Sequence, residues 1–374
     1  MKAVRDGLIS AGHSVHTFTL STPKFPVVEE TAAGMEAFSY CYVDTTVRIW
    51  PAFRDLCLNR SYHISRFYHN KTSEQLLQLL RKSEFDAILI ESIFMMPYFR
   101  LIRENFSGPV ILRAHNIEHL IWQRIAENES NILKKRYLKT LSRQLKRFEL
   151  NCFLQADAIA TISEVDEDIV RRMVPAAEVK TIPFAISGND ILFAKKQFTV
   201  TFGHIGSMDW TPNSEGIDWF LNDAWPVIHK KHPEAIFRLA GRNMPQRFFN
   251  LEKSGIMTVG EVDNAAAFMQ QLDLMIVPLL SGSGVRIKIA EALSLGVPVM
   301  TTAVGAEGLH VKNGHDIFIC TSTDQIINGI DQIIENPGLL KSIADEGLKT
   351  IKAFHSSEAV TDGLVSLILK KMKA

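Results

Sequence analysis

Short apolar runs alternate with longer stretches of helical periodicity along almost the whole of this 374-residue chain. This alternation constrains the fold more than any other feature, because it is typical of parallel sheets with helices on both faces. The apolar runs predict strands at 15–20, 85–90, 110–114, 158–162, 179–182, 199–204, 235–239, 256–259, 274–278, 297–301 and 317–320. The clearest helical patterns lie at 132–154, 213–231 and 284–295. The sequence therefore predicts an α/β protein.

Breaks in this pattern divide the chain into two doubly wound domains of similar size and a helical tail. Glycine and polar residues interrupt it within 187–197, which we interpret as a linker. After Cys320 only helix is expected, with breaks near Pro337 and His355. With 46% hydrophobic residues, the chain is long enough to bury two cores.

The chain opens in an unusual way for an α/β protein. A helix is predicted to end at Gly12, and the first predicted strand follows it. Domains of this kind normally begin with a strand. We therefore expect the first strand, and the glycine loop that follows it, to be missing from this sequence.

The composition argues against several classes of protein. Acidic and basic residues balance at 41 each, so nucleic acid is not expected as a partner. The four cysteines are scattered without a C-x-x-C pair, which predicts neither a zinc site nor a disulfide framework and favours a reducing cytoplasm. No apolar run approaches the roughly 20 residues that span a bilayer, and no signal peptide opens the chain.

A loop of glycine and serine follows the strand that ends at Pro278, and a helix is predicted from about Val285. Unpaired N–H groups at a helix start favour a phosphate, and glycines let the backbone approach it closely. We therefore predict that a ligand phosphate contacts the loop residues Ser281, Gly282, Ser283 and Gly284.

Charged residues follow directly on this loop. Arg286 and Lys288 would stand in the first helical turn, where cations oppose the helix dipole unless a diphosphate is bound. Glu291 lies on the same helix face as Lys288 and can accept hydrogen bonds from a ribose. The simpler interpretation is a Lys288–Glu291 pair on an ordinary surface helix.

Three other predicted strands of the second half also end in glycine loops. The first precedes a helix that Asn213 is expected to cap. The carboxyl ends of parallel strands share one sheet edge, where such sheets bind their ligands, although each loop alone could be a simple tight turn. The residues predicted to bind the same ligand in these loops are Gly206, Ser207, Gly241, Arg242 and Val262.

Two features of the first half have both a structural and a functional interpretation. His115 follows a predicted strand, where an imidazole can hydrogen-bond a ligand hydroxyl or position a second substrate, or simply belong to the structure. The seven basic residues between Lys134 and Arg147 can rest on anionic lipid, or form a solvated helix face.

Taken together, these segments resemble glycosyltransferase family 4. The similarity covers nearly the whole chain and is strongest in the second domain. It lies in 114–118, 156–164, 206–213, 239–242, 259–260, 281–299 and 305–309.

The resemblance implies the GT-B fold, which has two Rossmann-like domains. It implies an acceptor-side domain at 1–187, a donor domain at 198–354, and a final helix at 355–374 that packs back on the first. It further implies retaining transfer from a nucleoside diphosphate sugar to a glycan or lipid-linked acceptor, without a metal or other cofactor. The expected setting is cell-surface polysaccharide synthesis in the cytoplasm, at the inner face of the membrane.

The resemblance also assigns roles to residues. Glu291 matches the second glutamate of the family's E-x7-E motif, which holds the ribose, and His115 matches a histidine near the donor sugar. Arg286 and Lys288 are similar to the diphosphate cations of one branch.

Two positions depart from the family pattern. The first glutamate of the motif falls on Ser283, so sugar recognition is expected to rest on backbone amides. The usual Arg and Lys after the first strand of the second domain are absent, with Ser207 and Asn213 nearby instead. The diphosphate is therefore expected to depend on the two cations of the later motif.

Three alternatives stay open at this point. A nucleotide-sugar 2-epimerase of the same fold would turn over the donor without an acceptor. A catalytically weak nucleotide-sugar binding protein would bind the donor only. An NAD-dependent oxidoreductase would need G-x-G-x-x-G with an acidic residue about 20 positions later, which the chain lacks.

Overall fold

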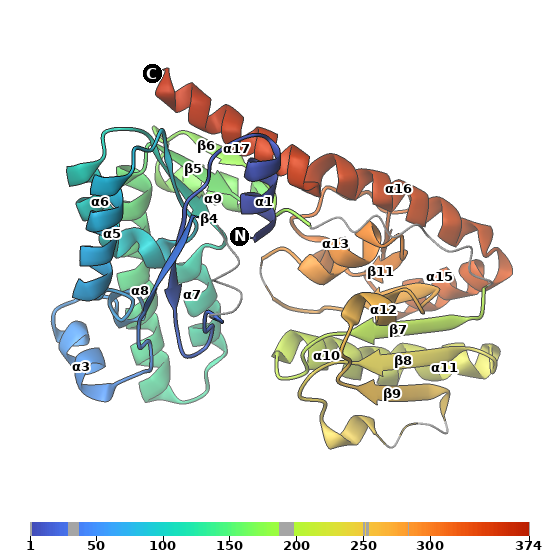
Figure 1. Ribbon diagram of the computed structural model, residues 1–374. Helices are drawn as coiled ribbons and strands as arrows, with labels where there is room; N and C mark the ends of the chain where they lie inside the picture. Colours follow the sequence, from blue (N-terminus) through green and yellow to red (C-terminus); the bar gives the residue numbers. More distant parts are fainter. Residues whose placement is uncertain are drawn as a thin grey trace. The chain divides into compact units, whose positions relative to one another are not determined.

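The chain forms two compact units, which are Met1–Pro183 with Val360–Ala374 and Phe184–Ala359 (Figure 1). The computed structural model describes residues 2–28, 37–186, 198–249, 251, 254–282 and 284–373. All strand pairings among these residues are parallel, so the predicted α/β fold is confirmed. The expected linker at 187–197 lies outside the described residues.

A four-stranded parallel sheet forms the centre of the first unit. Its order is β3 (Ile88–Ile90), β4 (Val110–Ala114), β5 (Ala158–Thr161) and β6 (Val179–Thr181). Every residue of β4 and β5 is buried, which means that both faces of the sheet are covered. The helices around it are α5 (Asn70–Lys82), a 3₁₀ helix (Ile93–Tyr98), α6 (Phe99–Asn105), α7 (Glu118–Asn128), α8 (Ile132–Gln155) and α9 (Glu164–Met173).

A separate two-stranded sheet pairs β1 (Thr17–Ser21) with β2 (Phe38–Tyr42). The strand β2 was not predicted, because it contains no aliphatic residue and Ser39 interrupts its aromatic residues. The helices α1 (Lys2–Ser10), α3 (Ile49–Cys57), α4 (Tyr62–Ser65) and α17 (Ser357–Met372) complete this part of the chain. Lys371 of α17 pairs with Glu178 of the first unit at 3.2 Å.

The second unit contains a six-stranded parallel sheet. The sheet order is β12-β11-β10-β7-β8-β9, so the chain runs outward from β7 on one side and then returns to continue from β10 on the other. Ligands of doubly wound sheets bind at such a reversal, outside the carboxyl ends of the strands. The strands are β7 (Thr201–Ile205), β8 (Ile236–Ala240), β9 (Ile256–Gly260), β10 (Leu274–Val277), β11 (Val299–Thr301) and β12 (Phe318–Ile319).

The helices of the second unit follow the predicted pattern with one interruption. The helix expected at 213–231 is α10 (Thr211–Trp219), a π-helical turn (Phe220–Ala224) and α11 (Trp225–Lys231). Pro226 stands at the start of α11 and has no N–H to continue the preceding ladder. The others are a 3₁₀ helix (Gln246–Phe248), α12 (Ala265–Met269), α13 (Ile287–Ser294), α14 (Ala303–Ala306), α15 (Thr323–Glu335) and α16 (Gly338–His355). The breaks predicted near Pro337 and His355 are confirmed.

Candidate functional site

The carboxyl ends of β7 and β8 meet through glycine backbone. The Gly206 N–H donates to the Ala240 carbonyl at 3.1 Å, and the Gly241 N–H donates to the Gly260 carbonyl at 2.7 Å. Gly241 has a φ of +148°, and a Cβ there would lie 1.7 Å from the Gly206 carbonyl oxygen. The sheet order β10-β7-β8-β9 confirms that the four predicted loops share one edge.

Lys288 lies beside the end of β7, although the two are far apart in the sequence. Its Nζ donates to Asn213 Oδ1 at 2.7 Å, and lies 3.4 Å from the Ile205 carbonyl oxygen and 3.3 Å from His204 Nε2. The Nδ1 of the buried His204 lies 2.8 Å from the Ile276 carbonyl oxygen. A carbonyl only accepts, so Nδ1 carries the proton and Nε2 accepts from the Lys288 ammonium.

This environment changes the protonation of Lys288. Burial lowers its pKa to about 7, and the charge of Arg286 adds to the effect. Burial also holds the pKa of His204 well below its usual value, so this imidazole is neutral. Within the described part of the chain, Lys288 forms no ion pair with Glu291, so the simpler interpretation of that pair is wrong. A bound anion would supply the opposite charge.

Arg286 is buried immediately before helix α13. The helix begins at Ile287, two residues later than predicted, with Arg286 as its N-cap residue rather than inside the first turn. The Arg286 guanidinium donates to the Gly284 carbonyl at 2.7 Å and lies 5.3 Å from the centre of the Trp210 ring. A side chain on Gly282 would meet this guanidinium, since a Cβ there lies 2.7 Å from Arg286 Nη2.

Asn213 does not cap helix α10, contrary to the prediction. The helix begins at Thr211, and its cap position is Trp210. The side-chain amide of Asn213 instead donates to the Ser207 carbonyl at 2.8 Å, while its Oδ1 accepts from Lys288. Asn213 therefore links the loop after β7 to the start of α13.

The remaining predicted residues differ in their surroundings. Ser207 donates to Asp209 at 2.5 Å, and Ser281 donates to Glu215 at 3.1 Å. Glu291 is exposed, and partial desolvation raises the pKa of its carboxyl. Three further positions are the exposed Arg242, the half-buried Val262, which packs on the core, and Ser283, which lies outside the described residues.

In the first unit, His115 follows β4 and contacts a carboxylate that the sequence did not indicate. His115 Nε2 lies 2.7 Å from Glu91 Oε2, and the buried Arg113 lies 3.3 Å from Glu91 Oε1. Burial raises the pKa of Glu91, but the His115 hydrogen bond and the Arg113 charge outweigh it and hold the pKa below its usual value. Glu91 follows β3 directly, so its place after a strand was the signal that could have found it.

Glu118 begins helix α7, three residues after His115, and is also largely buried. Burial and the neighbouring Glu149 raise the pKa of Glu118 to about 7. Glu149 is fully buried and accepts hydrogen bonds from the Glu118 N–H at 2.7 Å and the His119 N–H at 3.0 Å. His63 Nε2 lies 3.9 Å from Glu118 Oε2. Titratable groups of shifted pKa therefore gather after β4 as well.

Solved structures with the same fold define the class of this protein. Sucrose-phosphate synthase from Thermosynechococcus elongatus is 16% identical, with a TM-score of 0.68 over 98% of this chain and 91% of that one. Anabaena HepE in complex with UDP and glucose is 12% identical, with a TM-score of 0.61 over 94% of this chain and 91% of that one. These likenesses and the parallel sheets show a GT-B fold.

Family models identify the chain more closely. Residues 1–187 match the model for Glycosyltransferase Family 4, and residues 199–336 match the model for Glycosyl transferases group 1. The chain therefore belongs to glycosyltransferase family 4, as the motifs predicted. A Klebsiella pneumoniae protein described as "Uncharacterized 44.6 kDa protein in cps region" is 21% identical over 301 residues, which are 78% of this chain and 76% of that protein.

Proposed function

We propose that this glycosyltransferase moves a hexose from a nucleoside diphosphate sugar to a glycan or lipid-linked acceptor, with retention of the anomeric configuration. The second unit would bind the donor and the first would receive the acceptor. The observation that carries the proposal is the pair of cations, Lys288 and Arg286, beside the glycine backbone where the sheet order reverses.

The state of Lys288 supports a diphosphate as the ligand. An ammonium that is desolvated beside another cation loses part of its charge, as its pKa of about 7 shows. A diphosphate between Lys288 and Arg286 would restore that charge and remove their repulsion. The backbone around Gly206 offers close approach, since a Cβ there would lie 2.9 Å from Lys288 Nζ.

The proposed chemistry follows from this placement of charge. The bond between the anomeric carbon and the phosphate oxygen breaks, and negative charge gathers on the leaving diphosphate. Preorganised cations stabilise such charge more effectively than water does. The acceptor oxygen attacks the same face of the sugar, and its proton passes to the leaving phosphate oxygen. In this scheme His115, oriented by Glu91, contacts the donor sugar. No metal takes part in this proposal.

The biological setting is proposed from the relatives. The Klebsiella protein comes from a cps region, and HepE was solved with UDP and glucose. We therefore place this enzyme in cell-surface polysaccharide synthesis and expect a UDP-hexose as donor. A lipid-linked acceptor would bring it to the inner face of a membrane from the cytoplasm.

Calorimetry with UDP-sugars tests the donor site. Lys288→Met and Arg286→Met should each weaken donor binding about tenfold or more, because each removes a charge-assisted contact to phosphate. Glu291→Gln should weaken it through the ribose. Lys230→Met, which removes an exposed lysine of α11, is the matched control. The proposed donor site is refuted if all four variants bind the donor with the affinity of the wild type.

A transfer assay tests the reaction itself. Donor and candidate acceptors are incubated together, and the anomeric configuration of the product is determined by NMR. A product of inverted configuration would refute retention. Turnover of the donor without any acceptor would refute the transferase proposal in favour of an epimerase.

A further inference from the structure

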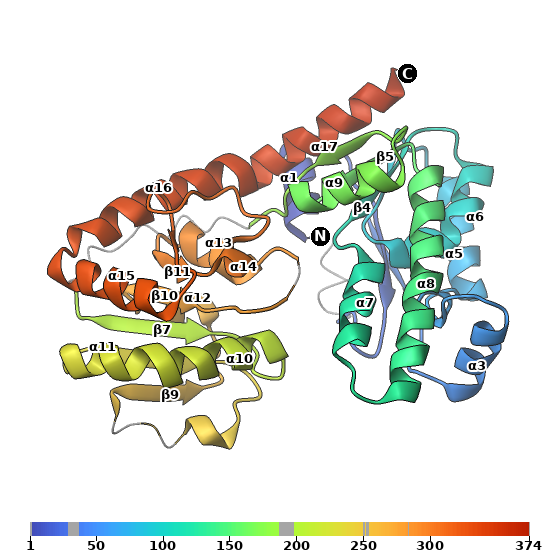
Figure 2. The ribbon, with the colours of Figure 1, turned by 180° about the vertical axis from the view of Figure 1, so that it is seen from behind.

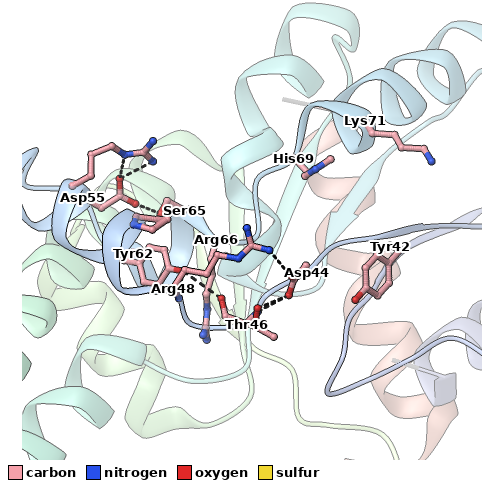
Figure 3. A pocket seen from close by; sticks show the side chains of 12 residues that line it. Tyr42, Asp44, Thr46, Arg48, Asp55, Tyr62, Ser65, Arg66, His69 and Lys71 are labelled. Atoms are coloured by element: carbon pink, nitrogen blue, oxygen red, sulfur yellow. Dashed lines mark hydrogen bonds and ion pairs between the residues drawn. The ribbon is translucent and has the colours of Figure 1, made fainter.

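A cavity of about 470 Å³ lies in the first unit, in the region formed by β2, α3 and α4 (Figure 3). It is lined by side chains that the proposed reaction does not use. The charged ones are Asp44, Arg48, Arg54, Asp55, Arg66 and Lys71.

The charges of this cavity favour an anionic ligand. Four cations face two carboxylates, which leaves two positive charges in excess. Asp44 is taken by Arg48 at 2.6 Å, and Asp55 by Arg54 at 3.2 Å. Within the described ranges, neither Arg66 nor Lys71 has a carboxylate partner. Burial lowers the pKa of the Arg66 guanidinium, whose contacts are a carbonyl at 3.3 Å and a histidine ring.

Large apolar side chains stand exposed beside the cavity. Helix α3 carries Ile49, Trp50 and Phe53, which are 83%, 81% and 58% exposed, next to the cavity residues Arg48 and Arg54. Such side chains stay in water only at an energetic cost, and their spacing places them on one face of the helix. An apolar face with cations at its border is the pattern of a helix that lies in a membrane interface.

The start of helix α8 also carries exposed apolar side chains. Ile132 and Leu133 are 77% and 79% exposed. One turn further, burial raises the pKa of Tyr137, and two cavity residues lie close enough to act on it, since Tyr62 raises this pKa and the charge of Arg66 lowers it. Figures 1 and 2 both place α3 and the beginning of α8 at the same end of the first unit.

We propose that this docking surface, formed by Ile49, Trp50, Phe53, Ile132 and Leu133, binds a membrane that contains anionic phospholipid. The apolar side chains enter the interface, and the cavity beside them binds a lipid phosphate through Arg66 and Lys71. The inference rests on the proposed function in one respect, since a lipid-linked acceptor requires an enzyme at a membrane. The proposed membrane contact lies on α3 and the start of α8. The sequence had instead suggested the basic residues in the middle of α8.

A chain of contacts leads from the cavity to the proposed acceptor side. Arg66 Nη2 lies 3.4 Å from His63 Nδ1, and His63 Nε2 lies 3.9 Å from Glu118. Glu118 follows His115 by three residues at the end of β4. A lipid phosphate in the cavity would thus lie in the unit that is proposed to receive the acceptor, connected through these contacts to the end of β4.

Vesicle flotation of the full chain tests the proposal. The wild type should float with vesicles of phosphatidylcholine and phosphatidylglycerol, and much less with phosphatidylcholine alone. The double variant Ile49→Ser/Trp50→Ser should lower the partition coefficient about tenfold or more, because apolar insertion is lost. Lys71→Gln should lower it about fivefold, because one cation of the proposed phosphate site is lost. All these residues are exposed, so folding should be preserved, as circular dichroism can verify.

The matched control is Leu154→Ser/Arg172→Gln, which removes an exposed leucine and an exposed arginine elsewhere in the first unit. Its flotation should equal that of the wild type. The proposal is overturned if the Ile49/Trp50 variant floats like the wild type, if neutral vesicles bind equally well, or if the control loses as much binding. It is equally overturned if Trp50 is needed only for self-association or for binding a protein.

Donor calorimetry without vesicles separates the two proposals. The docking variants should bind UDP-sugar as the wild type does, because their substitutions lie in the first unit. A wild type that floats but binds no donor would refute the proposed transferase alone. A wild type that binds donor but does not float would refute the docking surface alone.

Discussion

Raising the pH from 7 to 9 should weaken donor binding through one residue, Lys288. Its pKa of about 7 reflects burial and the nearby charge of Arg286, so it titrates in a range where ordinary lysines stay charged. A bound diphosphate favours the ammonium and raises this pKa. Binding therefore takes up a proton, and the affinity falls as the pH rises above 7.

The magnitude follows from the fraction of Lys288 that carries a proton before binding. With a pKa of about 7, that fraction is about one half at pH 7 and about one hundredth at pH 9. If the bound form stays protonated, the affinity for a nucleotide sugar falls about 50-fold over this range. A nucleotide sugar is the right ligand, because its diphosphate has no proton to lose near neutral pH.

Titration calorimetry in two buffers of different ionisation enthalpy measures both the affinity and the proton uptake. The uptake should be about half a proton at pH 7 and close to one at pH 9. Lys288→Arg should bind with nearly the same affinity at both pH values, since a guanidinium stays charged. A wild-type affinity that is flat from pH 7 to 9, or an equal slope in the arginine variant, would refute the reasoning.

Three further predictions concern stability, measured by urea unfolding. Gly241→Ala should lower the free energy of unfolding by about 3 kcal/mol or more, because the new Cβ would clash with the Gly206 carbonyl. Gly314→Ala is the control: Gly314 also has a positive φ but lies in open space, so the loss should be about 1 kcal/mol. Glu91→Gln should cost about 3 kcal/mol by leaving the buried Arg113 without its carboxylate, and the exposed Glu104→Gln should change nothing measurable. Burial lowers the pKa of His355 to about 4 in the folded chain, against about 6.5 in the unfolded chain. As the pH falls below 6.5, His355 is therefore protonated in the unfolded chain but still neutral in the folded chain. Stability should then drop by about 2 kcal/mol from pH 7 to pH 5 through this group, and His355→Asn should remove that share.

Much of the fold follows from the sequence because buried parallel strands are apolar along their whole length. The strand β4 was predicted with its true ends, since every residue from Val110 to Ala114 is buried. The strand β2 could not be found in this way, because its residues are mostly half-buried and none of them is aliphatic. The pairing of β1 with β2 in a separate sheet is a tertiary contact, and no local sequence pattern predicts it.

The residues of the candidate site likewise include some that the sequence predicted and some that it did not. The glycines at the strand ends were visible because a backbone contact such as that of Gly241 with Gly206 leaves only glycine as a choice. Glu91 was overlooked although it directly follows a predicted strand, because a single carboxylate there is a weak signal without a distinctive spacing. The start of α13 was placed two residues early, because no serine, threonine, aspartate or asparagine marks it and Arg286 stands at the cap position.

Asn213 explains how two separate sequence motifs come together in the proposed donor site. The sequence placed Asn213 in the loop motif after β7 and Lys288 in the motif after β10, and assigned the asparagine to helix capping. In the structure the amide of Asn213 bridges the Ser207 carbonyl and the Lys288 ammonium, which are 81 positions apart in the chain. Because His204 and Ile205 supply only neutral acceptors, the ammonium is held in place without being neutralised. This arrangement fixes the position of the Lys288 ammonium and leaves its charge for the proposed diphosphate to balance.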